Sequence, residues 1–175
     1  MAQPAIFTLN NADIHIHLIG LSGPNRGFIR PHLFNSIPLR IMRFLLGIKS
    51  GSPEEMEKDY KARLLGWMES SRYLDNFVLL ALDRVYGADG RPDTEKTMLH
   101  TSNTYVLETA AQSRQIYAAV SVHPYRKDAT DKIEEYSEQG AVLLKWIPSY
   151  MGFSPLDKRL VPVYDKLAAL TLPLL

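Results

Sequence analysis

Apolar and polar residues alternate strictly in the run Asp13-Ile14-His15-Ile16-His17-Leu18. Alternation with a period of two is typical of a half-buried β-strand, in which every second side chain lies on the same face. His15 and His17 therefore share a face, and both imidazoles can reach one metal ion. Two histidines on the wet face of an ordinary strand are the alternative, because the bare spacing is not specific. The opposite face can be buried and carries Ile14, Ile16 and Leu18.

The composition limits the chemistry open to this sequence. We expect one domain over residues 1–175, long enough to bury a substantial core. Charges nearly cancel, with 20 Lys and Arg against 19 Asp and Glu, so we expect no nucleic-acid partner. Because there is no cysteine, a metal must be bound by His, Asp, Glu, carbonyls or a modified lysine. Neither a secretory signal nor a membrane span is evident, and a cytoplasmic protein without a membrane partner is expected.

Strands and helices are predicted to alternate along the chain. After the histidine strand comes an inserted loop and helix region, residues 19–52, in which an amphipathic segment predicts a lid or a partner-facing helix. Apolar runs predict buried strands over residues 76–82, 116–124 and 141–147, with a further strand opening at 172–175. Helices are predicted over residues 53–73, 103–115, 128–139 and 156–171. This order predicts an α/β protein with a parallel sheet.

Polar residues fall where the predicted strands end. Asp83, His123 and Lys145 each follow or interrupt the end of an apolar run, as His15 and His17 do in the first strand. In a (β/α)8 barrel the carboxyl ends of the strands build the active site. We therefore expect these side chains to surround a shared mouth.

Two passages carry a resemblance to a known family. The first is Asp-Ile-His-Ile-His at residues 13–17. The second begins at Val122-His123-Pro124, passes through Gly140 to Pro148, and ends with Leu172-Pro173-Leu174. Together they resemble the amidohydrolase-related branch of the metal-dependent hydrolase superfamily, which includes small-acid decarboxylases and lactonases. The resemblance spans essentially the whole chain and reaches about the fifth of the eight barrel strands.

The resemblance implies a fold and an activity. The fold is a (β/α)8 TIM barrel of the metal-dependent hydrolase type, truncated here to about its first five strands. His15 and His17 would bind a divalent metal, zinc first, with manganese and iron also open. The expected reaction is hydrolysis of a small carboxylate, ester or amide by a metal-activated water, or a related decarboxylation. The family's later ligands and its general base have no counterpart before Leu175, so no catalytic residue is assigned.

Lys145 and His123 are the candidate substrate-binding residues. For Lys145 three roles stay open: a carbamate that bridges two metals, an ammonium group facing a substrate carboxylate, or an ammonium group paired with a neighbouring acid. A buried lysine needs a partner for its charge, so we expect one nearby. His123 would form a structural hydrogen bond or contact the substrate. Asp83 would line the mouth or cap the turn that follows it, and we favour the cap.

A second reading assigns no catalysis to the chain. A half-barrel leaves the edges of its first and fifth strands unpaired, which favours association with other chains. Such a fragment would serve as a structural or interaction module, or pair with a second copy as a homo-oligomer. A phosphoesterase on a related barrel ranks third, because no glycine loop of the kind that cradles phosphate is evident.

Overall fold

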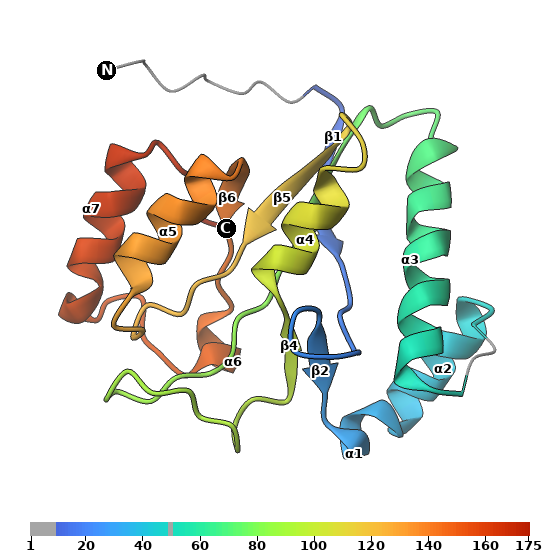
Figure 1. Cartoon of the computed structure of the whole chain (residues 1–175), viewed down its shortest axis with the longest axis horizontal. Coiled ribbons are helices and arrows are strands. Elements are labelled where there is room, and N and C mark those ends of the chain that lie inside the picture. The colour runs from blue at the N-terminus through green and yellow to red at the C-terminus, as the bar shows by residue number, and fades with distance from the viewer. Residues whose placement is uncertain (1–9, 49–50) are drawn as a thin grey trace.

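A four-stranded parallel sheet lies at the centre of the computed structural model, which describes residues 10–48 and 51–175. Its strands follow one another in the order β1-β3-β5-β6 (Figure 1). Beyond β6, Leu174 pairs in parallel with Leu144, where a further strand was predicted to open. The α/β class with a parallel sheet is thus confirmed. The four strands are Ala12–His17 (β1), Asn76–Leu80 (β3), Ile116–Val120 (β5) and Ala141–Leu144 (β6).

Helices connect the successive strands of the sheet. In Figure 1, α5 and α7 lie side by side, while α4 packs against β5. The predicted helices are all present, although each is shorter than its apolar pattern suggested. The connecting helices are Pro53–Glu69 (α3), Asn103–Ala110 (α4), Ala129–Glu138 (α5), and the 3₁₀ turn Lys158–Leu160 (η1) that continues into Val161–Ala169 (α7). A short helix, Pro148–Met151 (α6), occupies part of a predicted loop.

The long helix α3 begins as its sequence indicates. The Ser52 hydroxyl accepts a hydrogen bond from the backbone N–H of Glu55, and the Glu55 carboxylate accepts one from the backbone N–H of Ser52. This capping box satisfies amide groups that the first helical turn leaves free. The helix buries Met56, Leu64 and Met68, whereas Trp67, which shares their helical spacing, is 51% exposed.

The sheet buries both of its faces. One face packs under the helices and contributes strand residues such as Phe77, Leu79 and Ala118 to the core. The other face holds a small apolar cluster formed by Val78, Leu80, Ala119 and Leu143. The strand registers align His17 with Leu80, Leu80 with Ala119, and Ala119 with Leu143. His17 therefore lies in the row of residues that forms the second face.

The insertion after β1 contains a short strand that the sequence did not reveal, in addition to helices. Its short strand β2 (Gly27–Ile29) pairs antiparallel with β4 (Leu99–Thr101), which follows β3 along the chain. Gly27 is required there: its φ is 148°, and a Cβ would lie 2.1 Å from the His100 carbonyl oxygen. Two helices follow, Pro31–Phe34 (α1) and Ile37–Leu45 (α2).

Helix α2 presents apolar side chains on two sides. Leu39 and Met42 pack inward against the cluster around Phe34, Ile48 and Met56. Outward, Phe44 is 82% exposed, and Ile37, Ile41 and Leu45 are exposed with it. The predicted amphipathic helix is therefore present, with apolar surface that nothing in the described residues covers.

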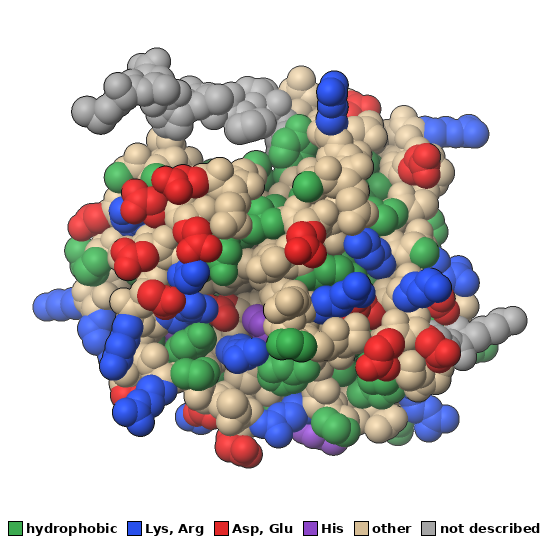
Figure 2. Space-filling model, in the orientation of Figure 1, with side chains coloured by type: hydrophobic (Ala, Val, Ile, Leu, Met, Phe, Trp, Pro, Cys, Tyr) green, Lys and Arg blue, Asp and Glu red, His purple; other side chains and the backbone are tan. Residues whose placement is uncertain are grey.

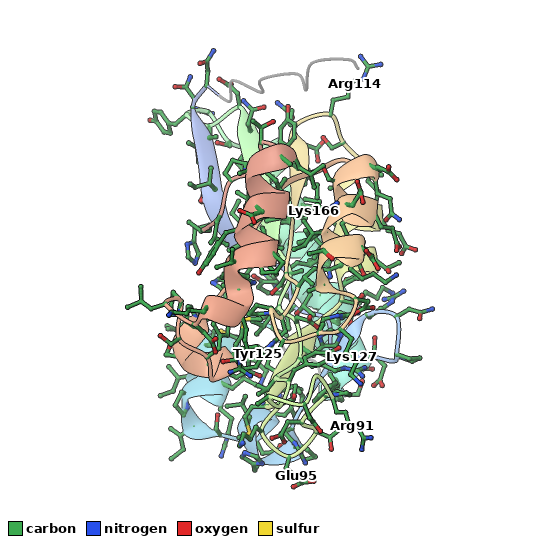
Figure 3. All side chains as sticks on the ribbon, turned by 90° about the vertical axis from the view of Figure 1, so that its left-hand side faces the viewer. Arg91, Glu95, Arg114, Tyr125, Lys127 and Lys166 are labelled. Atoms are coloured by element: carbon green, nitrogen blue, oxygen red, sulfur yellow. The ribbon has the colours of Figure 1, made fainter. Side chains whose placement is uncertain are left out.

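The described surface is mixed in charge on the face that Figure 2 shows, where acidic and basic side chains are interspersed. Figure 3 looks along the long axis of the molecule, with Arg114 at the top of the view and Arg91 and Glu95 at the bottom. Among the residues that the structure describes, no helix has the length and apolar character needed to cross a membrane.

Candidate functional site

The two histidines of the opening strand lie together on β1. Their ring centroids are 5.1 Å apart, and both residues are exposed. The Asp13 carboxylate accepts a hydrogen bond from the backbone N–H of His15 at 2.9 Å, as expected for an acid at the start of a strand. Ile14 was expected to be buried but is 45% exposed, because β1 is an outer strand of the sheet. The predicted pair of neighbouring imidazoles is therefore formed at an accessible edge.

Neighbouring elements hold the end of β1 in place. The Tyr60 hydroxyl, from α3, donates a 2.6 Å hydrogen bond to the carbonyl oxygen of His17. The Thr101 hydroxyl, from β4, donates a 3.1 Å hydrogen bond to the carbonyl oxygen of Leu18. A ligand-bearing strand fixed in this way needs little ordering when its side chains bind.

The His17 imidazole is neutral over the physiological range. Its partial burial is the largest of three causes that together lower its pKa from 6.5 to about 4, and the positive charge of Lys145 and the neighbouring His15 are the other two. A neutral imidazole keeps a lone pair free for a metal without first losing a proton. His17 is therefore in the protonation state that metal binding requires.

Lys145 follows β6 and is 2% exposed. Lys145 lies two residues after Leu143, a residue of the second face of the sheet, and alternation along the strand places it toward that face. The effect of its charge on His17 agrees with this placement. Burial lowers the pKa of its ammonium group from 10.5 to about 8. Within residues 10–48 and 51–175, its Nζ atom has neither a hydrogen-bond nor an ion-pair partner. The expected neighbouring acid is thus not found there, and the other two roles of Lys145 stay open.

His123 is completely buried, and both of its ring nitrogens are used within the protein. Nδ1 accepts a 3.1 Å hydrogen bond from the backbone N–H of Tyr125, so the proton is on Nε2, which donates to the Met151 carbonyl oxygen at 2.9 Å. This arrangement favours the structural role for His123 over a substrate contact.

Asp83 is buried and connects two of the loops that follow the strands of the sheet. One carboxylate oxygen accepts from the backbone N–H of Arg84, which is the predicted cap of the following turn. The other accepts from the backbone N–H of His123 at 2.8 Å and lies 3.4 Å from the Arg126 guanidinium. Asp83 therefore ties the loop after β3 to the loop after β5, with both of its carboxylate oxygens hydrogen-bonded within the protein.

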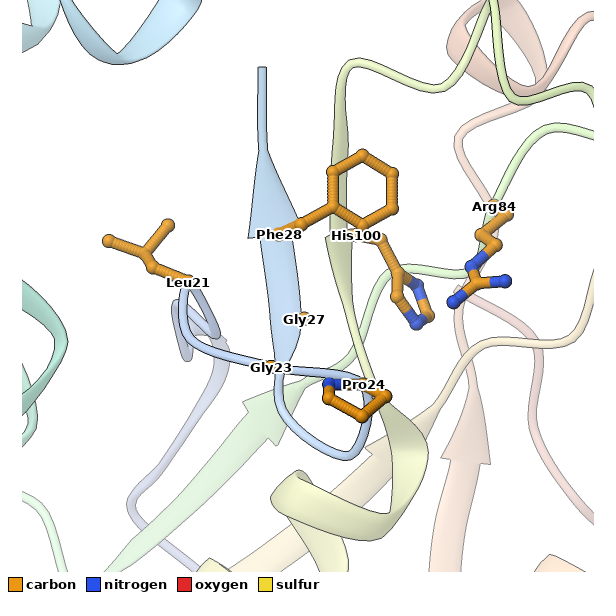
Figure 4. A pocket seen from close by; sticks show the side chains of 7 residues that line it. All are labelled: Leu21, Gly23, Pro24, Gly27, Phe28, Arg84 and His100. Carbon is orange, nitrogen blue, oxygen red and sulfur yellow. The ribbon is translucent and has the colours of Figure 1, made fainter. Parts of the chain in front are cut away.

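Two residues near these strand ends were missed from the sequence. Arg84 and His100 both line a cavity beside the loop that follows β1 (Figure 4). Arg84 directly follows Asp83, so its place at a strand end was a usable signal. His100 lies on a three-residue strand that no local pattern marked.

The arrangement offers a metal two imidazoles and a nearby buried amine. Among the described residues, no three His, Asp or Glu side chains gather in a way that would bind a metal ion. His15 and His17 fit as two ligands of an open site, since both are accessible and His17 is neutral. The charge of Lys145, whose Nζ atom has no hydrogen-bond partner among the described residues, acts on His17 as well.

In comparisons with known proteins, no family model, curated protein or solved structure matches the chain. Its function is therefore inferred from the geometry of His15, His17 and Lys145.

Proposed function

We propose that this protein is a metal-dependent hydrolase of the amidohydrolase type. Its substrate is a small carboxylate, ester or amide, and decarboxylation of a small acid is the related alternative reaction. The observation that carries the proposal is the placement of His15 and His17 on one accessible face of β1, with the buried and unpartnered Lys145 acting on the same face.

The order of the strands supports a barrel of the (β/α)8 type. Each strand of the parallel sheet lies next to the one that precedes it, and Leu174 continues the series beyond β6. In a flat sheet, the three spacings between β1 and β6 would separate them by about 14 Å. The charge of Lys145 nevertheless lowers the pKa of His17. A sheet that curls toward this face, as a barrel does, brings the two side chains closer.

The roles of the residues follow from their chemistry. His15 and His17 would hold the metal, with zinc the first choice because it favours imidazole ligands in open sites. When bound, the metal would polarise the scissile group and lower the pKa of a water toward neutrality. Lys145 would hold a substrate carboxylate through its ammonium group or, as a carbamate, supply a further ligand.

The metal content of the purified protein tests the proposal. The wild type and the His15→Ala/His17→Ala double variant are loaded with zinc, dialysed and measured by inductively coupled plasma mass spectrometry. His32→Ala is the matched control, because His32 is an exposed histidine on α1. We expect the wild type and the control to retain zinc and the double variant to lose it. Equal zinc in all three proteins would remove the basis for the site.

A non-catalytic interaction module is the second candidate. The exposed apolar side of α2, which ends with Phe44 and Leu45 at the C-terminus of the helix, favours it, as does the position of β1 at the edge of the sheet. Light scattering after size exclusion distinguishes the two functions. A metal-free dimer that Phe44→Ser/Leu45→Ser converts to a monomer would support this second function.

A further inference from the structure

A small cavity lies between the loop that follows β1 and the loop that follows β3. Its volume is about 190 Å³, and its lining includes Gly23, Phe28, Arg84 and His100. In Figure 4 the ends of the Arg84 and His100 side chains lie beside one another in the view, and the arrowheads of the parallel strands point toward the same region. The cavity thus lies beyond the carboxyl ends of the strands, where open and closed parallel sheets bind their ligands.

The positive charge of Arg84 is not neutralised within the described residues. Its Nε atom is buried without a hydrogen-bond partner, and no ion pair involves its guanidinium there. The adjacent Asp83 carboxylate is taken by the backbone N–H groups of Arg84 and His123 and by Arg126. An arginine that is left in this state at a cavity wall has donors available for an anion.

The segment that contributes most of the cavity lining has no acidic residue of its own. From Ile14 to Pro53 the chain contains no Asp or Glu, although it carries four arginines and one lysine. Arg26 is paired with Glu57, and the Arg30 guanidinium donates to the Thr97 carbonyl oxygen. Arg84 is therefore the cation at this cavity with donors to spare.

His100 supplies a hydrogen-bond acceptor to the same cavity. Its Nδ1 atom lies 2.8 Å from the carbonyl oxygen of Leu82, and since a carbonyl only accepts, Nδ1 carries the proton. Burial lowers the pKa of the ring, so the imidazole is neutral, and its Nε2 atom has no hydrogen-bond partner in the part of the chain that the structure describes. The Phe28 ring lies beside both groups: its centroid is 5.9 Å from the Arg84 guanidinium carbon and 6.0 Å from the His100 ring centroid.

We propose that this cavity binds a small 2-hydroxycarboxylate, whose carboxylate pairs with the Arg84 guanidinium and whose hydroxyl donates to Nε2 of His100. One unpaired guanidinium matches a monoanion, whereas a phosphate dianion would need a second cation. The cavity is below the roughly 300–1,000 Å³ of pockets for drug-sized ligands, which suits an acid of a few carbon atoms. The site involves neither His15 nor His17 and does not depend on a metal.

Isothermal titration calorimetry with glycolate in the presence of EDTA tests this subsite. Acetate lacks the hydroxyl and glycolamide lacks the charge, so both should bind more weakly than glycolate. Arg84→Gln should weaken glycolate binding by about tenfold or more, because it removes a charge-assisted hydrogen bond. Arg114→Gln is the matched control: Arg114 is exposed at the far end of the molecule (Figure 3) and should leave the affinity unchanged.

The outcomes separate this proposal from the metal site. Because EDTA removes zinc, the glycolate measurement does not depend on whether His15 and His17 can hold the metal. Equal affinity for glycolate and glycolamide, or an Arg84→Gln variant that binds as the wild type does, would overturn the subsite. Tighter binding of inorganic phosphate than of glycolate would overturn the carboxylate assignment. Should Arg84→Gln fail to fold, the comparison of glycolate with glycolamide and acetate on the wild type decides.

Discussion

The positive charge of Lys145, which directly follows the last strand of the four-stranded sheet, lowers the pKa of His17 at the end of the first strand. One side chain is exposed at the edge, and the other is almost completely buried. The positive charge of the lysine disfavours a second positive charge on the imidazole. The lysine charge thereby adds to burial in keeping His17 neutral, and a substitution at Lys145 removes the charge alone.

Replacing Lys145 with methionine should raise the pKa of His17 in metal-free protein. The variant removes a nearby positive charge and keeps an unbranched apolar stem of similar length. Burial is the larger cause of the lowered pKa, so the new value should lie above about 4 but stay below 6.5. Titration followed by NMR of the His17 ring protons measures this. An unchanged pKa would show that the two side chains do not interact.

The same variant should change how stability depends on pH. The pKa of Lys145 is about 8 in the folded protein against an ordinary value of 10.5, so folding expels a proton between these values. The unfolded chain then binds more protons than the folded one, and stability rises with pH through this window. Relative to Lys145→Met, the wild type should gain at most about 1.4 kcal/mol per pH unit between pH 8 and 10.5. Urea denaturation at several pH values checks it, and parallel curves would contradict it.

Glu57 anchors the loop after β1, and its loss should destabilise the fold. This fully buried carboxylate accepts hydrogen bonds from the backbone N–H of Leu21 at 2.6 Å and from Ser22 and Arg26. Burial alone would raise its pKa, but these donors outweigh it and hold the pKa below the usual value.

Because an amide offers one oxygen where the carboxylate offers two, Glu57→Gln should cost about 2–4 kcal/mol of unfolding free energy. Chemical denaturation measures the loss. The matched control is Glu69→Gln, an exposed position on the same helix, which should stay within about 0.5 kcal/mol of the wild type. A similar small effect at both positions would show that the anchor contributes little.

His123→Phe keeps a ring of similar size and removes two hydrogen bonds. The Tyr125 N–H and the Met151 carbonyl would lose their partners in the buried interior. We expect a loss of about 2–3 kcal/mol in the free energy of unfolding. Thermal and urea unfolding measure it. A fully stable variant would contradict the structural role that the geometry favours for His123.

The strands of the sheet were predictable because burial on both faces leaves a continuous apolar run. The runs that begin at Asn76, Ile116 and Ala141 stand out for this reason. Lys145 was predictable for a related reason, because it is a charged residue that interrupts the end of such an apolar run. The histidine pair was found because side chains alternate along a strand.

The parts of the site that escaped prediction depend on contacts between distant segments. Phe28 meets His100 only because a three-residue strand pairs with another far along the chain, and three residues are too few to show a period. The buried state of Glu57 likewise depends on the loop at Leu21 and Ser22, which no helical pattern reveals. Trp67 kept its helical spacing but is exposed, since no element covers that side of α3 in the described structure.

An anomalous difference map of zinc-soaked crystals, collected at the zinc absorption edge, tests the metal site most directly. The proposed function predicts a peak about 2.0–2.1 Å from one ring nitrogen of His15 and one of His17. No peak at this pair, or a peak at His32 or His100 in its place, would contradict it.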